Sequence, residues 1–374
     1  MVTDDRRSFV ASQRFDTLDA LRGICAVLVV LFHFTSSGTI GGSAFIRRSW
    51  LFVDYFFVLS GFVIAHGYGD RLASRGISIA RFMGLRLGRL YPLHFVVLLA
   101  FVAVELVLLV FQDRLGGLAS RPAFTGSRDI TGLVQSLLLL NFFDSGHGLS
   151  WNGPSWTIAA EFWTYLLFAL VLFVSKGRFA WVAGLIVLLA LAWLVAVPGT
   201  LAITVRGGLI RCIMGFGIGL LTYRFYRRFG GPGGTVKELL TVAAALLYVG
   251  MCVPGPMTIA APFVFAVGIF VLASQNGAVS RVLSWPLFQF LGLTSYSIYL
   301  VHHFVQARLS DVLQVAGIFD VTPSPAGTIE FPGSPLLADA VSLAMLAMVL
   351  ATSYVSYHLV EKPGRDLSRR WLNR

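Results

Sequence analysis

Long apolar runs alternate with short polar segments along the whole chain. Ten of these runs approach the roughly 20 residues that an α-helix needs to cross the hydrocarbon core of a bilayer. They occupy residues 18–37, 51–68, 92–111, 155–175, 180–197, 206–222, 236–253, 257–274, 287–305 and 338–358. The pattern predicts an all-α polytopic membrane protein of about ten transmembrane helices.

A further apolar run, at 131–143, is too short for a crossing and is followed by polar and glycine residues up to Gly148. We predict a re-entrant or short outer-surface segment there, near 131–147. Loops are predicted at the stretches rich in Pro and Gly, namely 230–234, 254–256 and 323–335. We expect residues 1–374 to form a single integral membrane domain with no appended soluble domain.

Composition and charge support the same class of protein. Of the 374 residues, 56% are hydrophobic and 13% are charged, whereas a soluble domain carries about 25% charged residues. The net charge of +11 does not indicate a nucleic-acid partner, because Lys and Arg collect in the predicted loops of one face, 20 against 7 on the other. This bias predicts a multi-pass protein with both termini in the cytoplasm.

The cysteines and the start of the chain exclude other classes. Cys25, Cys212 and Cys252 lie inside apolar runs, so they indicate neither a disulfide framework nor a metal site. Residues 1–17 are polar, and no small-residue cleavage site follows the first apolar run. We therefore expect that run to stay in the protein as a membrane anchor.

Ionisable residues inside the predicted spans are candidate functional groups, because burying a charge in lipid costs at least ~2.5–3.5 kcal/mol. Arg22 and His33 are eleven residues apart in the first span, which places them on one face of a helix about 16 Å apart along its axis. Glu161 and the pair His302 and His303 fall at a depth similar to His33. A histidine near a carboxylate suits removal of a proton from a hydroxyl. The alternative is a snorkelling arginine with histidines in ordinary interhelical hydrogen bonds.

Two further arginines come directly before the third span. Arg86 and Arg89 are three residues apart in the predicted cytoplasmic loop 69–90, and this spacing puts them on one helical face. Guanidinium groups bind phosphates through charge-assisted, bidentate hydrogen bonds. The pair is therefore a candidate phosphate-binding site, with an ordinary positive-inside loop as the alternative.

Six motifs fall in one order over residues 18 to 363. They are Leu18-Asp-Ala-Leu-Arg-Gly with His33 eleven residues after Arg22, Val53-Asp-Tyr-Phe-Phe-Val-Leu-Ser-Gly-Phe, Arg86-Leu-Gly-Arg-Leu-Tyr-Pro, Gly153-Pro-Ser-Trp-Thr-Ile-Ala-Ala-Glu, Gly292-Leu-Thr-Ser-Tyr-Ser-Ile-Tyr-Leu-Val-His and Glu361-Lys-Pro. Together they resemble the acyltransferase-3 family, which comprises bacterial inner-membrane O-acyltransferases that modify polysaccharides and, in some members, antibiotics. No single motif is specific, but six in order are.

The resemblance implies an enzyme that takes an acyl group, commonly acetyl, from acyl-CoA at the cytoplasmic side and transfers it to an acceptor hydroxyl. It implies a location in the bacterial inner membrane and an acceptor that is a glycan or lipid-linked saccharide, with other polysaccharide-assembly proteins as partners. The motifs assign the catalytic role to His33 and Glu161 and donor binding to Arg22, Arg86 and Arg89. The remaining motif residues expected to line the site are Asp54, Ser60, Trp156, Tyr296 and His302. Thr157 stands where many members carry Ser, and it keeps the hydroxyl.

The predicted mechanism combines these groups. We expect the donor's phosphates at the cytoplasmic arginines, and His33, oriented by Glu161, to deprotonate the acceptor; a covalent acyl-histidine relay is left open. Two other functions share some of these features. A transporter would explain the intramembrane charges but not Arg86 and Arg89, and an acyltransferase acting on a small-molecule natural product would share every motif.

Overall fold

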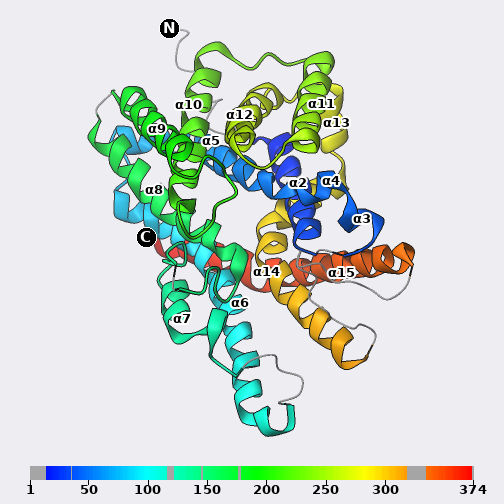
Figure 1. Cartoon of the computed structure of the whole chain (residues 1–374). Coiled ribbons are helices and arrows are strands. Elements are labelled where there is room, and N and C mark those ends of the chain that lie inside the picture. The colour runs from blue at the N-terminus through cyan, green and yellow to red at the C-terminus, as the bar shows by residue number, and fades with distance from the viewer. Residues whose placement is uncertain are drawn as a thin grey trace.

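The computed structural model describes residues 14–34, 36–115, 122–144, 146–175, 178–317 and 334–372. These residues form helices joined by turns and short loops (Figure 1). Most of residues 1–17 and nearly all of the predicted loop 323–335 lie outside the described part of the chain. The predicted all-α fold is confirmed.

Each of the ten apolar runs coincides with one helix. The helices are α2 (Asp16–His33), α5 (Phe52–Ala73), α6 (Ile79–Leu115), α8 (Trp156–Val174), α9 (Phe179–Ala196), α10 (Gly208–Phe229), α11 (Thr235–Met251), α12 (Ala261–Leu272), α14 (Pro286–Val315) and α15 (Pro335–Ser356). Among the described residues, six helical stretches are long and apolar enough to cross a membrane: Ala44–Ala73, Ile79–Phe111, Gly153–Val174, Phe179–Ala196, Gly208–Phe229 and Pro335–Leu372. The count of ten crossings stays a prediction.

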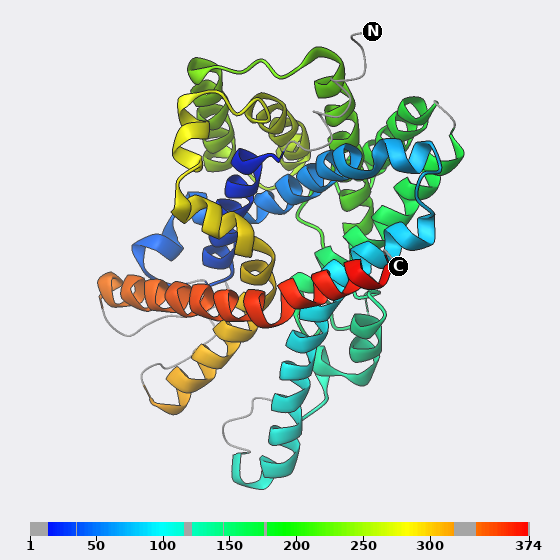
Figure 2. The ribbon, with the colours of Figure 1, turned by 180° about the vertical axis from the view of Figure 1, so that it is seen from behind.

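Shorter elements complete the description. They are α3 (Thr39–Gly42), α4 (Ala44–Arg47), η1 (Ser49–Leu51), η2 (Gly126–Arg128), α7 (Ile130–Leu137), η3 (Gly153–Ser155), η4 (Pro256–Ala260), α13 (Ala278–Leu283), the π-helical η5 (Tyr357–Glu361) and α16 (Lys362–Leu372). Seen from behind, α15, η5 and α16 form a long helical path that crosses α14 and reaches α6 (Figure 2).

The segment after α5 is more helical than the sequence pattern predicted. The predicted loop 69–90 is wrong for most of its length, because α5 continues to Ala73 and α6 already begins at Ile79. The residues that follow Ile79 are largely good helix formers, so the helix starts before the apolar run does. Arg86 and Arg89 therefore lie on α6 itself, a rigid element.

The short apolar run near residue 131 forms α7, which has eight residues. Asp129 caps this helix, since its side chain accepts a hydrogen bond from the Gly132 backbone N–H at 2.9 Å. A helix of this length spans only about 12 Å and cannot cross a bilayer. Figure 1 shows α7 beside the second half of α6, where both extend away from the other helices.

Segments predicted for the same face of the membrane contact one another. Hydrogen bonds and ion pairs join Thr17 to Gln275 and Asp70 to Arg227 on one face, and Ile40 to Asp339 and Asp144 to Arg206 on the other. These contacts agree with the predicted sidedness of the loops. The cytoplasmic placement of the termini stays a prediction.

Glycines allow the central helices to approach closely. A Cβ at Gly23 of α2 would lie 2.3 Å from the Leu291 backbone of α14, and one at Gly292 would lie 2.5 Å from the Asp19 carbonyl oxygen. On α10, a Cβ at Gly219 would lie 1.9 Å from the Val58 carbonyl oxygen of α5. Such backbone contacts are typical of membrane helix packing. They hold α2 against α14 and α5 against α10, and so fix the positions of α2, α5 and α14, which line a cavity.

Candidate active site

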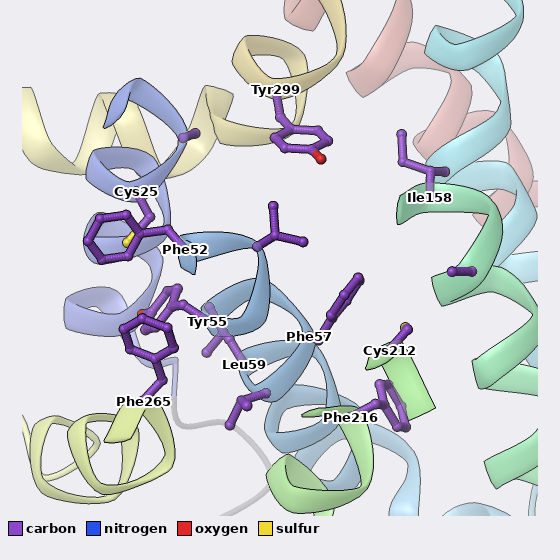
Figure 3. Packing of buried hydrophobic residues seen from close by; sticks show 14 of the residues in the cluster. Cys25, Phe52, Tyr55, Phe57, Leu59, Ile158, Cys212, Phe216, Phe265 and Tyr299 are labelled. Atoms are coloured by element: carbon purple, nitrogen blue, oxygen red, sulfur yellow. The ribbon is translucent and has the colours of Figure 1, made fainter. Parts of the chain in front are cut away.

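A cavity of about 110 Å³ lies between α2, α5, α6, α8 and α14. Its polar lining residues are Arg22, Ser60, Arg86, Arg89, Thr157, Glu161, Tyr165, Ser295, Tyr296 and Tyr299. Six of the residues predicted from the sequence are therefore brought together from five helices. Figure 3 shows part of the apolar wall, with Phe57 of α5 and Ile158 of α8 facing the same space as Tyr299 of α14.

The three arginines that line the cavity differ in how many hydrogen-bond partners the protein gives their guanidinium groups. Arg22 donates to Ser295 Oγ at 2.8 Å and to the Gly292 carbonyl at 3.0 Å, and it forms an ion pair with Asp19 at 3.2 Å. Arg86 is buried, and it has a single hydrogen bond, to the Tyr68 hydroxyl at 2.8 Å, while its Nε has no hydrogen-bond partner among the described residues. Its guanidinium also lies 4.6 Å from the centre of the Tyr68 ring.

Arg89 lies one helical turn from Arg86 and also lines the cavity. Its guanidinium makes no hydrogen bond to any residue that the structure describes. A half-buried guanidinium with five N–H donors and no acceptor is poised for an anionic ligand. This is the strongest indication that the cavity binds something.

Glu161 lies in the same cavity but not beside His33. Its carboxylate accepts hydrogen bonds from the Tyr165 hydroxyl at 2.5 Å and from the Ser60 hydroxyl. The prediction that Glu161 orients His33 is therefore wrong. Helical depth alone suggested the pairing, and the rotation of α8 instead directs Glu161 toward α5. Among the described residues, Glu161 is the one carboxylate that lines this cavity, together with the three arginines.

His33 lies at the other end of α2, outside the residues that line the cavity. Its Nδ1 is 2.9 Å from the Val29 carbonyl oxygen. Because a carbonyl can only accept, Nδ1 carries the proton, and the neutral ring keeps an unprotonated lone pair on Nε2. The side chain is exposed. His33 is thus arranged as an accessible base or nucleophile.

Two aromatic side chains connect His33 to the cavity. The ring of His302 lies 4.9 Å from that of His33 and 5.7 Å from that of Tyr299, which lines the cavity. His302 is fully buried, and both of its ring nitrogens lack hydrogen-bond partners among the described residues. The sequence placed His302 in the site, and the structure places it between the cavity and His33.

Asp54 and Trp156 do not line the cavity, contrary to expectation. Asp54 is buried and receives two hydrogen bonds from Arg211 of α10, at 2.9 and 2.7 Å. Trp156 packs against Gly208 at the start of α10 and stands 5.9 Å from the Arg211 guanidinium. Both side chains therefore hold α10 in place behind the cavity wall.

Sequence reasoning also missed Tyr165, Tyr299 and the partner of Asp54. Tyr165 follows Glu161 by four residues, a spacing that brings two side chains together on a helix, so this contact could have been found. Arg211 lies inside the predicted span 206–222, and such a charge requires a counter-charge. Nothing in the sequence identified Asp54 as that partner.

These features define an integral membrane protein of packed helices whose interior cavity carries three arginines and a carboxylate. Comparison with known families makes the assignment specific, since the acyltransferase-domain model of the acyltransferase-3 family matches residues 15–358. The chain belongs to this family and is an acyltransferase.

Similar proteins are consistent with this assignment. The chain is 27% identical to acyltransferase MdmB of Streptomyces mycarofaciens, over 91% of this chain and 84% of that protein. It is 25% identical to the putative membrane-bound transacylase BcsY of Komagataeibacter xylinus, over 97% and 86%. A shorter match, 40% identical, covers 26% of this chain and 48% of protein 2 in the picA locus of Rhizobium radiobacter, about half of that protein. No solved structure matches the chain.

Proposed function

We propose that this acyltransferase takes an acetyl group from acetyl-CoA at the cytoplasmic face of a bacterial inner membrane and transfers it to a hydroxyl of a cell-surface or exported glycan. The observation that carries the proposal is the cavity lined by Arg22, Arg86 and Arg89, in which Arg89 has no hydrogen-bond partner among the described residues. A coenzyme A donor supplies the phosphates that such guanidinium groups bind.

In the proposal, the cavity at one end of α2 binds the donor, and His33 at the other end activates the acceptor. Arg22 is eleven residues before His33, which corresponds to about 16 Å along the helix. In the proposal, Arg86 and Arg89 hold the phosphates of the donor, and the acyl-bearing end of the donor extends along the cavity toward Tyr299 and His302. The acceptor approaches His33 from the opposite face, where its side chain is exposed.

The transfer step uses the free lone pair on Nε2 of His33. In the general-base route, Nε2 takes the proton of the acceptor hydroxyl as the acceptor oxygen bonds to the thioester carbonyl carbon. The carbon–sulfur bond then breaks, the thiolate of coenzyme A leaves, and the proton passes from His33 to that thiolate. General-base assistance of this kind contributes about 10²–10⁴-fold. In the covalent route, Nε2 itself bonds to the carbonyl carbon while the carbon–sulfur bond breaks and the thiolate of coenzyme A leaves. The acceptor oxygen then bonds to the same carbon as the carbon–nitrogen bond to His33 breaks, and the acceptor proton passes to the thiolate.

Glu161 takes a positioning role in this proposal. Its carboxylate faces a cavity with three arginines and is held by the hydroxyls of Ser60 and Tyr165. It balances part of the positive charge while the donor is absent, and it fixes the two hydroxyl groups on the cavity wall. Tyr296, whose hydroxyl donates to the Leu90 carbonyl at 2.5 Å, forms the neighbouring part of that wall.

The test is an analysis of ester-linked acetyl groups on cell-surface glycans in cells with and without the gene. Cells that lack the gene should lose a defined set of esters, the parent gene should restore them, and His33→Ala at matched expression should not. Glycan esters that do not depend on the gene would contradict the glycan acceptor. If acetyl transfer from labelled acetyl-CoA then appeared only on an exported small molecule, the acceptor would belong to that class instead.

A further inference from the structure

A second cavity lies between α5, α8, α9 and α10, on the face that the charge bias predicts to be cytoplasmic. Its volume is about 450 Å³. The apolar part of its lining consists of Ala65, Gly69, Ala73, Leu172, Phe179 and Leu220, and the polar part of Asp70, Tyr223, Arg224, Arg227 and Arg228. The acyl-transfer mechanism described above uses none of these residues.

This cavity is separate from the donor cavity. The two have no lining residue in common. On α5, Ser60 faces the donor cavity and Gly69 the second one, and nine residues at 100° each place these two positions on opposite sides of the helix. α5 therefore stands between the two spaces.

The cavity carries excess positive charge. Arg227 forms an ion pair with Asp70 at 2.6 Å, which neutralises one of the three arginines. Arg224 and Arg228 are exposed and make no hydrogen bond to any residue in the described part of the chain; Arg228 stands 5.4 Å from the Phe229 ring. Two guanidinium groups are thus available for an anion at the mouth of the cavity.

The helices α9 and α10, which border the second cavity, also carry exposed apolar side chains. Along α9, Trp181 is 83% exposed and Leu188 is 63% exposed, as expected of a helix that faces lipid. On α10, Phe225 and Phe229 are also exposed beside the arginines. A ligand that fits both the two exposed arginines and the apolar lining carries an anionic phosphate at one end and hydrocarbon at the other.

We propose that this cavity binds an anionic phospholipid, with the phosphate of the headgroup at Arg224 and Arg228 and an acyl chain against the apolar lining and α9. Basic pockets between transmembrane helices at the cytoplasmic side are a recognised form of lipid-headgroup site. A free phosphate compound would use the arginines but not the apolar lining. The assignment of a lipid therefore rests on the apolar lining that lies beside the two arginines in the same cavity.

The experiment measures retention of phosphatidylglycerol against phosphatidylcholine on the purified full-length protein by native mass spectrometry. Arg224→Gln/Arg228→Gln tests the headgroup site. Arg369→Gln/Arg370→Gln is its matched control, because these two exposed arginines lie on α16 and the charge change is the same.

A second pair of variants tests the apolar part without changing charge. Gly69→Leu places a side chain into the cavity, where a Cβ meets nothing within 4 Å. Gly67→Leu is its control, since it lies on the same helix, is equally open and does not line the cavity. Thermal unfolding in phosphatidylcholine nanodiscs checks that each variant is folded.

We expect the parent to retain phosphatidylglycerol in preference to phosphatidylcholine, and both site variants to lose that preference by on the order of 10-fold. The two controls should behave like the parent. If the arginine variant does not fold, Gly69→Leu alone decides the question. Equal retention in parent and site variants would overturn the proposal, and so would loss in the controls. Displacement of the lipid by coenzyme A or by inorganic phosphate would also overturn it, because the cavity would then be a nucleotide or free-anion site.

Discussion

Two arginines within the helices of this protein, Arg211 and Arg89, differ in their partners. Arg211 donates two hydrogen bonds to Asp54 and a third to the Ile203 carbonyl at 3.2 Å, so its guanidinium is satisfied by the protein. Arg89 lines a cavity and has no hydrogen-bond partner among the described residues. A satisfied buried charge serves the fold, whereas an unsatisfied one facing a cavity indicates a ligand.

The comparison shows that membership of a motif does not reveal the role of a residue. Asp54 and Ser60 fall in the same sequence motif on α5, yet Asp54 faces α10 and Ser60 faces the cavity lined by the three arginines. Removing a side chain such as Asp54, which contacts another helix, should lower the stability of the fold. Removing one such as Ser60, which lines the cavity, should reduce activity in a protein that still folds.

The largest effect is expected at Asp54. Asp54→Ala leaves the Arg211 charge buried without a counter-charge, which costs about 3–5 kcal/mol of stability. Thermal unfolding of the detergent-solubilised protein should show the loss.

The chain offers a matched control for that variant on the same two helices. Asp70 and Arg227 also join α5 to α10, but their side chains are 78% and 49% exposed, so Asp70→Ala should cost no more than about 1 kcal/mol. An Asp54→Ala protein as stable as Asp70→Ala, with weakened donor binding alone, would place Asp54 in the donor site after all.

The next effect is expected at His33. His33→Ala should lower acyl transfer by about 10²–10⁴-fold, because it removes the only nitrogen lone pair that the ring offers to the acceptor. Stability and coenzyme A affinity should stay at the parent level, since His33 does not line the cavity proposed to bind the donor. Turnover with labelled acetyl-CoA and equilibrium binding of coenzyme A measure the two properties separately. Near-normal acylation at matched expression would refute the role of His33.

A smaller effect is expected for the two arginines proposed to bind the donor. Arg86→Ala and Arg89→Ala should each weaken coenzyme A binding by about 1.5–3 kcal/mol, the contribution of a hydrogen bond to a charged group. Arg86→Lys should restore only part of the affinity, because an ammonium group lacks the planar fork of donors. Wild-type affinity in both alanine variants would move the donor site elsewhere.

Combining Arg89→Ala with His33→Ala extends the same test. The two side chains belong to different ends of the site and share no contact, so their effects on transfer should add. A double variant no worse than His33→Ala alone would instead indicate that the two residues act as a unit.

The sequence was sufficient for the helices because apolar runs of membrane length leave few other structures for the chain. It failed between Ala73 and Arg89, where polarity suggested a loop. The charges there lie on a helix that begins at Ile79, before the apolar run. Polar residues in the sequence indicate where a helix leaves the lipid, but they do not indicate where the helix ends.

For the site, the sequence identified residues that share a cavity but not their pairing. Depth along a helix follows from residue number, so Arg22 and His33 were correctly separated. Rotation relative to a neighbouring helix does not follow from residue number, and this is why Glu161 was assigned to His33 and not to Ser60. Packing contacts such as those of Gly23 and Gly219 decide that rotation.

The smallest effect is expected at Tyr68, which supports Arg86 from behind. Its hydroxyl accepts the hydrogen bond from Arg86 at 2.8 Å, and its ring lies under the guanidinium at 4.6 Å. Tyr68→Phe removes the hydrogen bond but keeps the ring, so Arg86 stays near its place with more freedom to turn. Because Tyr68 positions Arg86 and is not among the residues that line the cavity, KM for acetyl-CoA should rise about 2–10-fold. The turnover number kcat should hardly change. Tyr68→Ala, which also removes the cation–π contact, should raise KM further. A fall in kcat with unchanged KM in Tyr68→Phe would mean that this hydroxyl acts on the acyl group itself. Tyr68 would then belong to the residues of the transfer step and not to those that support donor binding.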